Sequence, residues 1–172
     1  TMDISFERNS TRFRVNMSRV LKGVCISFRT IPSKIPEPEE IRLSKHLLDL
    51  TQVEKGIILI TGPTGSGKST TMAAMIEHIN RFNSKHIITL EDPVEFIYEN
   101  KKSLIHQREL GKQFNSFPDG IRSLLREDPD VIVVGEMRDL ETIQTAITLA
   151  ETGHLVFSTL HTNDTVQTID RI

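Results

Sequence analysis

One short segment of the chain has the residue types and the spacing needed to hold nucleotide phosphates. It reads GPTGSGKS over residues 62–69 and matches the pattern G-x-x-x-x-G-K-[ST] at every fixed position. Glycines are needed there because backbone N–H groups must curl around phosphate oxygens, in conformations that a Cβ would hinder. We expect Lys68 to reach the β- and γ-phosphates and the hydroxyl of Ser69 to ligate Mg²⁺. The predicted phosphate site comprises Gly62, Pro63, Thr64, Gly65, Ser66, Gly67, Lys68, Ser69 and Thr70.

Acidic residues follow two other apolar segments. Residues 86–91 end in Glu91, and residues 131–134 run into Gly135, which stands where a Walker B strand usually has an Asp, and then Glu136. In an open parallel sheet the ligand lies outside the carboxyl ends of the strands, where both acids would converge on the phosphates. We therefore expect Glu136 to orient or deprotonate the attacking water, Glu91 to polarise that water, and either acid to hold Mg²⁺ through a water. The alternative is that both are ordinary strand-end residues that cap the next helix.

Two histidines, His154 and His161, bracket the apolar segment 155–160. Seven residues of extended strand span roughly 23 Å, so the two cannot form one metal pair. We expect His161, at the carboxyl end, to contact the region of the γ-phosphate, and His154, at the opposite end, to have a structural or interfacial role. A structural role for both is the alternative.

The order of strand-like and helix-like segments predicts the fold that must position these residues. Strands are expected at 57–61, 86–91, 131–134 and 155–160, and helices at 69–82, at 116–127 and along 140–150. This β-α-β order predicts an α/β fold with a mainly parallel sheet covered by helices on both faces. The phosphate segment then lies between a strand and a helix, which argues against a chance glycine-rich turn.

Composition and charge narrow the class of protein. The chain has 172 residues, of which 37% are hydrophobic and 26% are charged, as is ordinary for soluble globular proteins. With 21 Lys and Arg against 23 Asp and Glu, the net charge of −2 gives no global basic field, so we expect no nucleic-acid partner. The single cysteine, Cys25, cannot form an internal disulfide or a cysteine-based zinc site. We find no signal peptide and no transmembrane segment, and we expect a cytoplasmic protein with no direct membrane insertion.

The first 40 residues differ from the rest. Residues 12–15 and 24–29 alternate apolar and polar side chains like two strands of a small antiparallel sheet. Three prolines within residues 32–38 are typical of an extended linker. Thirty or so residues are too few to bury a core of their own, so we expect this segment to lean on another part of the protein.

Four ordered motifs together resemble the secretion ATPases of type II secretion and type IV pili. They are GPTGSGKST (62–70), ITLEDPVEF (88–96), LREDPDVIVVGEMRDLETI (125–143) and TGHLVFSTLHTNDT (152–165), with RFRVN (12–16) and FRTIPSKIP (28–36) upstream. Within that family the chain looks most like the pilus retraction (twitching motility) branch, on the sequences IHQRELG (105–111), GEMRD (135–139) and FRTIP (28–32). The sequence STLHTND (158–164) is also common in the assembly branch, which stays the alternative.

The resemblance implies a RecA-like P-loop NTPase core preceded by the last strands of a PAS-like α+β domain. Residues 1–31 would be the C-terminal part of the PAS-like domain, 32–40 a Pro-rich linker, and 41–172 the RecA-like ATPase core, truncated at its C-terminal end. Six such subunits would form a homo-hexameric ring, with nucleotide between the two domains. Position by position, the family's site residues match Lys68, Glu91, Glu136, His161 and His154.

Two arginines of the N-terminal segment also match family positions. Arg14 and Arg29 correspond to arginines that reach the γ-phosphate when the two domains close. There they would stabilise charge on the transferring phosphoryl group. Arg12 and Arg19 compete for the same role, and solvated strand arginines are the alternative.

The activity that the resemblance implies is Mg²⁺-dependent ATP hydrolysis, with ATP and ADP as ligands, that drives pilus retraction by pilin depolymerisation. The implied partner is an inner-membrane pilus platform protein, and the implied location is peripheral, at the cytoplasmic face of the inner membrane. An assembly or type II secretion ATPase is the second hypothesis. The third is a nucleotide-dependent switch with little turnover, against which Glu136 argues, since a pure binder needs no positioned acid.

Overall fold

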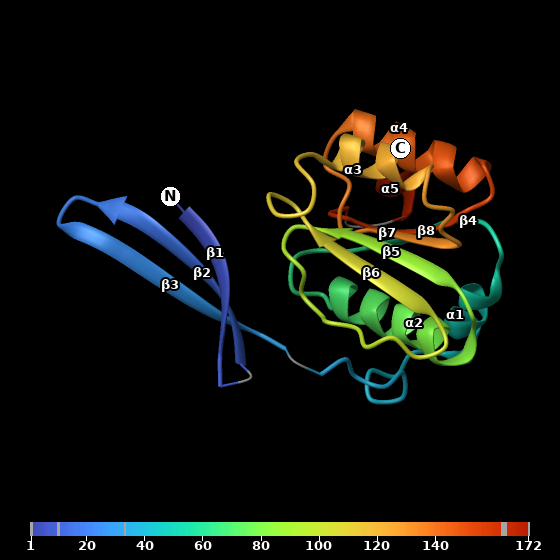
Figure 1. The fold of residues 1–172 in the computed structure, drawn as a ribbon, viewed down its shortest axis with the longest axis horizontal. Helices are drawn as coiled ribbons and strands as arrows, with labels where there is room; N and C mark the ends of the chain where they lie inside the picture. Colours follow the sequence, from blue (N-terminus) through green and yellow to red (C-terminus); the bar gives the residue numbers. More distant parts are fainter. Residues whose placement is uncertain (1, 10, 33, 163–164, 172) are drawn as a thin grey trace.

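The computed structural model describes residues 2–9, 11–32, 34–162 and 165–171 (Figure 1). An antiparallel sheet at the N-terminal end is followed by a parallel sheet flanked by helices, and an extended segment joins the two. In chain order the elements are β1 (Met2–Arg8), β2 (Thr11–Val20), β3 (Gly23–Ile31), α1 (Lys45–Asp49), η1 (Leu50–Gln52), β4 (Gly56–Thr61), α2 (Lys68–Phe82), β5 (His86–Glu91), β6 (Leu104–Glu109), α3 (Phe117–Leu124), β7 (Val131–Val134), α4 (Leu140–Glu151), β8 (Leu155–Leu160) and α5 (Thr165–Arg171).

The parallel sheet has the strand order β4-β8-β7-β5-β6, and every neighbouring pair is parallel. The predicted α/β fold with a mainly parallel sheet is therefore confirmed, and the strands expected from the sequence are β4, β5, β7 and β8. The sequence does not reveal β6. This strand lies at the edge of the sheet, and its second half, Gln107–Glu109, is polar, so the apolar signal of a buried strand is missing.

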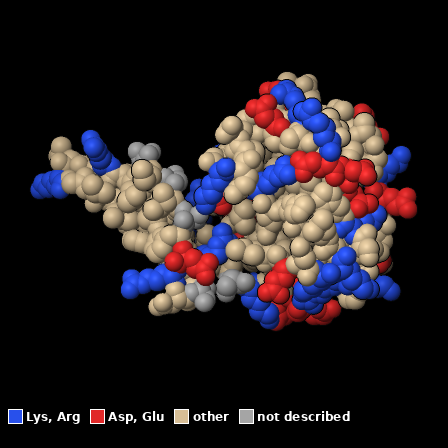
Figure 2. All heavy atoms as spheres, in the orientation of Figure 1, with Lys and Arg blue, Asp and Glu red and all other residues tan. Residues whose placement is uncertain are grey.

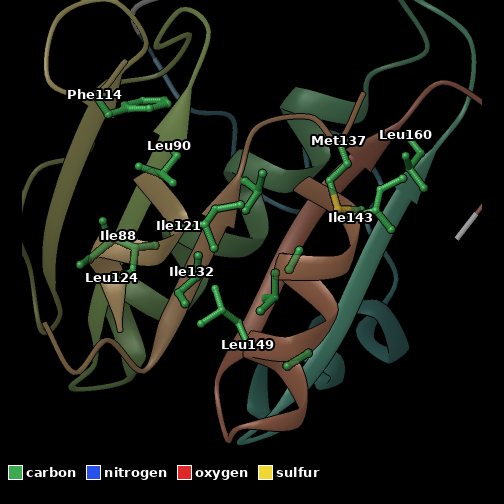
Figure 3. Close-up of a cluster of buried hydrophobic side chains, with 14 residues drawn as sticks. Ile88, Leu90, Phe114, Ile121, Leu124, Ile132, Met137, Ile143, Leu149 and Leu160 are labelled. Atoms are coloured by element: carbon green, nitrogen blue, oxygen red, sulfur yellow. The ribbon is translucent and has the colours of Figure 1, made fainter. Parts of the chain in front are cut away.

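Each face of the parallel sheet buries its own apolar cluster. α2 covers one face with Met72, Met75, Ile76 and Ile79. α3 and α4 cover the other face, where Ile121, Leu124, Ile143 and Leu149 pack against Ile88, Leu90 and Ile132 of the strands (Figure 3). Because successive strand residues point to opposite faces, Ile87 joins the first cluster and Ile88 the second. Strands that are buried on both faces need continuous apolar runs, which explains VIVV in β7.

The antiparallel sheet has the order β1-β2-β3 and two unlike faces. One face carries the rings of Phe6, Phe13 and Phe28, whose centroids lie 5.3 to 6.5 Å apart. The other face carries polar residues, among them Arg12 and Arg14 of β2. The structure contains the two strands expected from the sequence, with longer bounds, and adds β1. The assignment of residues 1–31 to a PAS-like domain stays a prediction.

The second half of the Pro-rich segment is attached to the C-terminal end of α2. The guanidinium of Arg81 binds both carboxylate oxygens of Glu37, at 2.6 and 2.7 Å, and its Nε lies 2.9 Å from Glu77 Oε1. The two carboxylates raise the pKa of Arg81 well above its ordinary value. A further backbone hydrogen bond, from Leu43 N–H to the Pro38 carbonyl at 2.8 Å, closes a turn after Glu37. These ion pairs therefore hold the second half of the Pro-rich segment against α2.

Charged side chains of both signs are mixed over the surface of the helix-covered part on the face that Figure 2 shows. This mixture agrees with the small net charge of −2. No large region of a single sign covers that part on this face.

Candidate nucleotide site

The loop between β4 and α2 has the backbone that its glycines predict. Gly62, Gly65 and Gly67 have φ values of +146°, +80° and +94°, which L side chains rarely adopt. A Cβ on Gly62 would also lie 2.8 Å from Ser66 Oγ. Gly67 is the N-cap of α2 and supplies no side-chain acceptor, so the first N–H groups of the helix are free to bind an anion beside the loop.

Lys68 is buried, and its ammonium lies inside this loop. Nζ donates to the carbonyl oxygens of Gly62 at 2.8 Å and Pro63 at 2.9 Å. The backbone of the loop thus holds a positive charge where the pattern places phosphates. Backbone N–H groups, the helix N-terminus and this ammonium together form a site suited to several negative charges.

Glu136 follows β7 and is 15% exposed at its side chain. Its Oε1 lies 2.6 Å from Arg138 Nη2, and its Oε2 lies 3.7 Å from Nε2 of His161, the residue after β8. Two hydrogen bonds join the ends of β7 and β8 beside it: Met137 N–H donates to the Thr159 carbonyl at 3.2 Å, and the Thr159 hydroxyl donates to the Gly135 carbonyl at 2.7 Å. The carboxylate is therefore held on a rigid strand end.

The structure gives a physical reason for glycine at position 135. The Gly135 N–H donates to the Leu90 carbonyl at 2.8 Å, so β7 and β5 run very close at this point. A Cβ on Gly135 would lie 3.2 Å from that carbonyl oxygen and 3.4 Å from the Cα of Glu91. Both are backbone atoms, so moving them aside would cost free energy. The acidic residue after this strand comes one position later, at Glu136.

Glu91, at the end of β5, is held by three hydrogen bonds. The Thr89 hydroxyl donates to Oε1 at 2.7 Å, Gln107 Nε2 donates to the same oxygen at 3.2 Å, and the Glu95 N–H donates to Oε2 at 3.3 Å. Burial raises the pKa of Glu91 above its ordinary value, and these hydrogen bonds oppose the rise only in part. A carboxyl group of this kind can change its protonation closer to neutral pH than an exposed one.

The sheet order brings these groups to one edge. The glycine-rich loop, His161, Glu136 and Glu91 follow β4, β8, β7 and β5, which are consecutive in the sheet. Neighbouring strands lie about 4.8 Å apart, so the loop is about 10 Å from Glu136 across β8. His154 lies at the opposite edge, where its Nδ1 is 2.9 Å from the Leu149 carbonyl at the end of α4. Asn163 and Asp164 of the histidine motif lie outside the described residues.

Arg14 and Arg29 are not brought to this edge. They lie opposite each other in the β2–β3 register, and neither guanidinium makes a hydrogen bond or ion pair within the described parts of the chain. Arg12 does reach the α/β part: its Nη2 donates to the Val94 carbonyl at 2.9 Å and its Nη1 to the Glu95 carbonyl at 3.3 Å.

Sequence reasoning missed three residues that support the two acids. Thr89 precedes Glu91 by two residues in the same strand. Because side chains alternate between the two faces of a strand, the sequence alone would have placed both on one face. Gln107 lies on the edge strand β6 and has no local signal. Arg138 belongs to the same motif as Glu136, but only the structure shows the ion pair.

Asp139 begins α4 and therefore helps to fix the segment that carries Glu136. Its carboxylate accepts from the Thr142 N–H at 2.8 Å and from the Thr142 hydroxyl at 2.9 Å, and these bonds lower its pKa. We expect Asp139→Ala to lower the free energy of unfolding by about 1 kcal/mol at pH 7, since an N-cap is lost. Because the folded pKa is below the unfolded value of 3.8, the stabilisation is present above that value and lost as pH falls further.

Urea unfolding at pH 7 and pH 3 measures this effect. Asp139→Asn is the control, since its amide oxygen still caps the helix at either pH. Equal stability of the alanine and asparagine variants at pH 7 would contradict the capping role.

No helix within the described residues combines the length and apolar character needed to cross a membrane. Within the same residues, no group of three or more His, Cys, Asp or Glu side chains is arranged to hold a metal ion. Any ion at this edge would therefore need ligands other than a cage of such side chains.

Comparison with known proteins agrees with this geometry. The family model described as "Type II/IV secretion system protein" matches residues 1–172. The chain belongs to this family. The type IV pilus retractation ATPase PilT of Pseudomonas aeruginosa is 53% identical over 171 residues, which are 99% of this chain and 50% of that protein. A twitching motility protein of Neisseria gonorrhoeae is 54% identical over 172 residues, which are 99% of this chain and 46% of that protein.

A solved structure gives the same result for the fold. The crystal structure of the pilus retraction motor PilT with bound ADP superposes with a TM-score of 0.95 at 53% identity, and the match covers 99% of this chain and 50% of that one. The chain thus spans about half the length of the curated relatives it matches. Its similarity to retraction proteins agrees with the branch expected from the sequence.

Proposed function

We propose that the chain is the nucleotide-binding part of an ATPase subunit that powers type IV pilus retraction. The observation that carries this proposal is the loop at residues 62–69, with the Lys68 ammonium inside it, on the same sheet edge as Glu136. A phosphate chain bound there would take over the hydrogen bonds that Lys68 now gives to the loop carbonyls. Its terminal phosphorus would then face the strand ends that carry the acids.

In the proposed reaction, the residues at that edge of the sheet have different roles. Water attacks the γ-phosphorus, the bond from this phosphorus to the β–γ bridging oxygen breaks, and ADP leaves. Glu136 orients the water and accepts its proton, while Lys68 stabilises the charge on the phosphates. His161, whose Nε2 lies 3.7 Å from Glu136 Oε2, would contact the γ-phosphate. Glu91 helps to orient the water from the neighbouring strand.

Mg²⁺ fits this edge without a protein cage. Such an ion usually keeps several waters and binds substrate phosphates with only one or two protein ligands. Ser69, in the first turn of α2, would supply a hydroxyl ligand, and Glu91 or Glu136 would act through water. The ion would neutralise charge that develops on the phosphates.

The remaining proposals concern the whole subunit. We propose a homo-hexamer in which Arg14 and Arg29 reach the γ-phosphate when the antiparallel sheet closes on a nucleotide site. The ring would act on an inner-membrane platform protein from a cytoplasmic, peripheral position. Retraction is favoured because relatives at 53% and 54% identity are named for retraction and twitching motility. A type II secretion role is the second candidate, supported by a type II secretion system protein E of Aeromonas hydrophila at 37% identity.

Two measurements test the proposal. The purified protein is expected to release phosphate from ATP, and the release is expected to stop when EDTA removes Mg²⁺. A deletion strain is expected to keep its pili, or to carry more of them, and to lose twitching. Absence of pili in that strain would favour a role in assembly over one in retraction. Absence of phosphate release would contradict the proposed ATPase activity.

A further inference from the structure

A single peptide unit lies between a guanidinium of the antiparallel sheet and a partly buried carboxylate of the parallel sheet. The carbonyl of Val94 and the N–H of Glu95 belong to the same planar peptide. The carbonyl accepts from Arg12 Nη2 at 2.9 Å, and the N–H donates to Glu91 Oε2 at 3.3 Å. The chain of contacts therefore runs from guanidinium to peptide to carboxylate.

Other bonds hold this peptide in place. The Val94 N–H donates to Glu109 Oε2 at 3.2 Å, and the Glu95 carbonyl accepts from Arg12 Nη1 at 3.3 Å. Glu109 is in turn paired with Lys112 at 2.6 Å. The N–H groups of residues 94 and 95 thus donate to two partly buried carboxylates, and their carbonyls accept from one arginine of β2.

Hydrogen bonds in such a chain strengthen one another. A cation at the carbonyl oxygen draws electrons from the peptide, makes its N–H a better donor, and so favours a negative charge on the acceptor. Docking of the arginine therefore acts on the carboxylate without touching it.

We propose that Arg12 is a positioning residue that couples docking of the antiparallel sheet to the orientation of the Glu91 carboxylate through the Val94–Glu95 peptide. This inference rests on the proposed function, in which Glu91 orients the attacking water. It gives Arg12 a role distinct from that proposed for Arg14 and Arg29. If the antiparallel sheet moved away from the core, Arg12 would release the Val94–Glu95 peptide, and the hydrogen bond from the Glu95 N–H to the Glu91 carboxylate would weaken. The site is therefore competent only when the sheet is docked.

The test compares Arg12→Gln, Arg12→Lys and, as a matched control, Arg8→Gln, which changes an exposed arginine of the same sheet. In Arg12→Gln we expect exchange of the Glu95 amide hydrogen to become about tenfold faster, and the kcat of phosphate release to fall about tenfold while the KM for ATP is unchanged. Arg12→Lys keeps the charge and is expected to restore most of both values. Arg8→Gln is expected to match the wild type.

Two results would overturn the inference. One is unchanged exchange of the Glu95 amide in Arg12→Gln. The other is a kcat that is unchanged in Arg12→Gln, or one that falls and is not restored by Arg12→Lys. The exchange measurement needs no turnover. If the wild-type protein released no phosphate, the proposed ATPase activity would be refuted, and amide exchange in Arg12→Gln would still test the role of Arg12.

Discussion

Replacing Glu136 with glutamine is expected to lower the rate of phosphate release by about 10²- to 10⁴-fold while ADP affinity stays within about twofold, the range that removal of a general base typically gives. Glutamine keeps the size and the hydrogen-bonding reach of the side chain but cannot accept a proton from water. The ion pair with Arg138 at 2.6 Å would become a hydrogen bond from the guanidinium to a neutral amide oxygen, so the fold around the strand end should persist. Steady-state phosphate release and ADP titration measure the two quantities on the same preparation.

Glu141→Gln is a suitable control. Glu141 lies on α4 a few residues away, is exposed, and pairs with Arg122 on the surface. We expect its turnover to match the wild type. If Glu136→Gln also kept full turnover, Glu136 would not be the base, and its assignment in the proposed reaction would be wrong.

Replacing Lys68 with alanine is expected to weaken ADP binding by about 10- to 100-fold and to remove measurable turnover, because one buried charge-assisted contact to phosphate is lost. Lys68 also donates to the carbonyls of Gly62 and Pro63, at 2.8 and 2.9 Å, and these oxygens would lose their donor. The loop would therefore lose both the charge that attracts the phosphates and a contact that shapes it.

The matched control for Lys68 is another lysine tied to the same sheet. Lys85 pairs with Asp130 at 3.2 Å, and both residues stand directly before strands, at the amino edge of the sheet. Lys85→Ala is expected to leave ADP affinity unchanged in isothermal titration calorimetry. Equal ADP affinity in Lys68→Ala and the wild type would mean that the glycine-rich loop is not the phosphate site.

Local sequence was enough to predict what depends on local backbone. The glycines at 62, 65 and 67 have positive φ, so no other residue type fits well, and their spacing is visible in the sequence. The joint position of Glu91 and Glu136 followed from one further rule, that the carboxyl ends of parallel strands share an edge. The structure pairs β5 with β7 directly, which makes the two acids neighbours.

Contacts between distant segments could not be predicted. Gln107 donates a hydrogen bond to Glu91 from an edge strand, which the sequence does not reveal because half of that strand is polar. Arg12 binds a peptide more than eighty residues away in the sequence. Arg12, Arg14 and Arg19 look alike in the sequence, and only docking of the sheet distinguishes the first. The close approach of Gly135 to Leu90 also needs the paired strands to be seen.

A structure of the protein with ADP and Mg²⁺ tests the central claim most directly, namely that residues 62–70 hold the phosphates opposite Glu136. We expect the β-phosphate to accept N–H bonds from the loop and Lys68 Nζ to move from the Gly62 carbonyl, now at 2.8 Å, to within about 3 Å of a phosphate oxygen. ADP bound elsewhere, with Lys68 still on the loop carbonyls, would contradict the account.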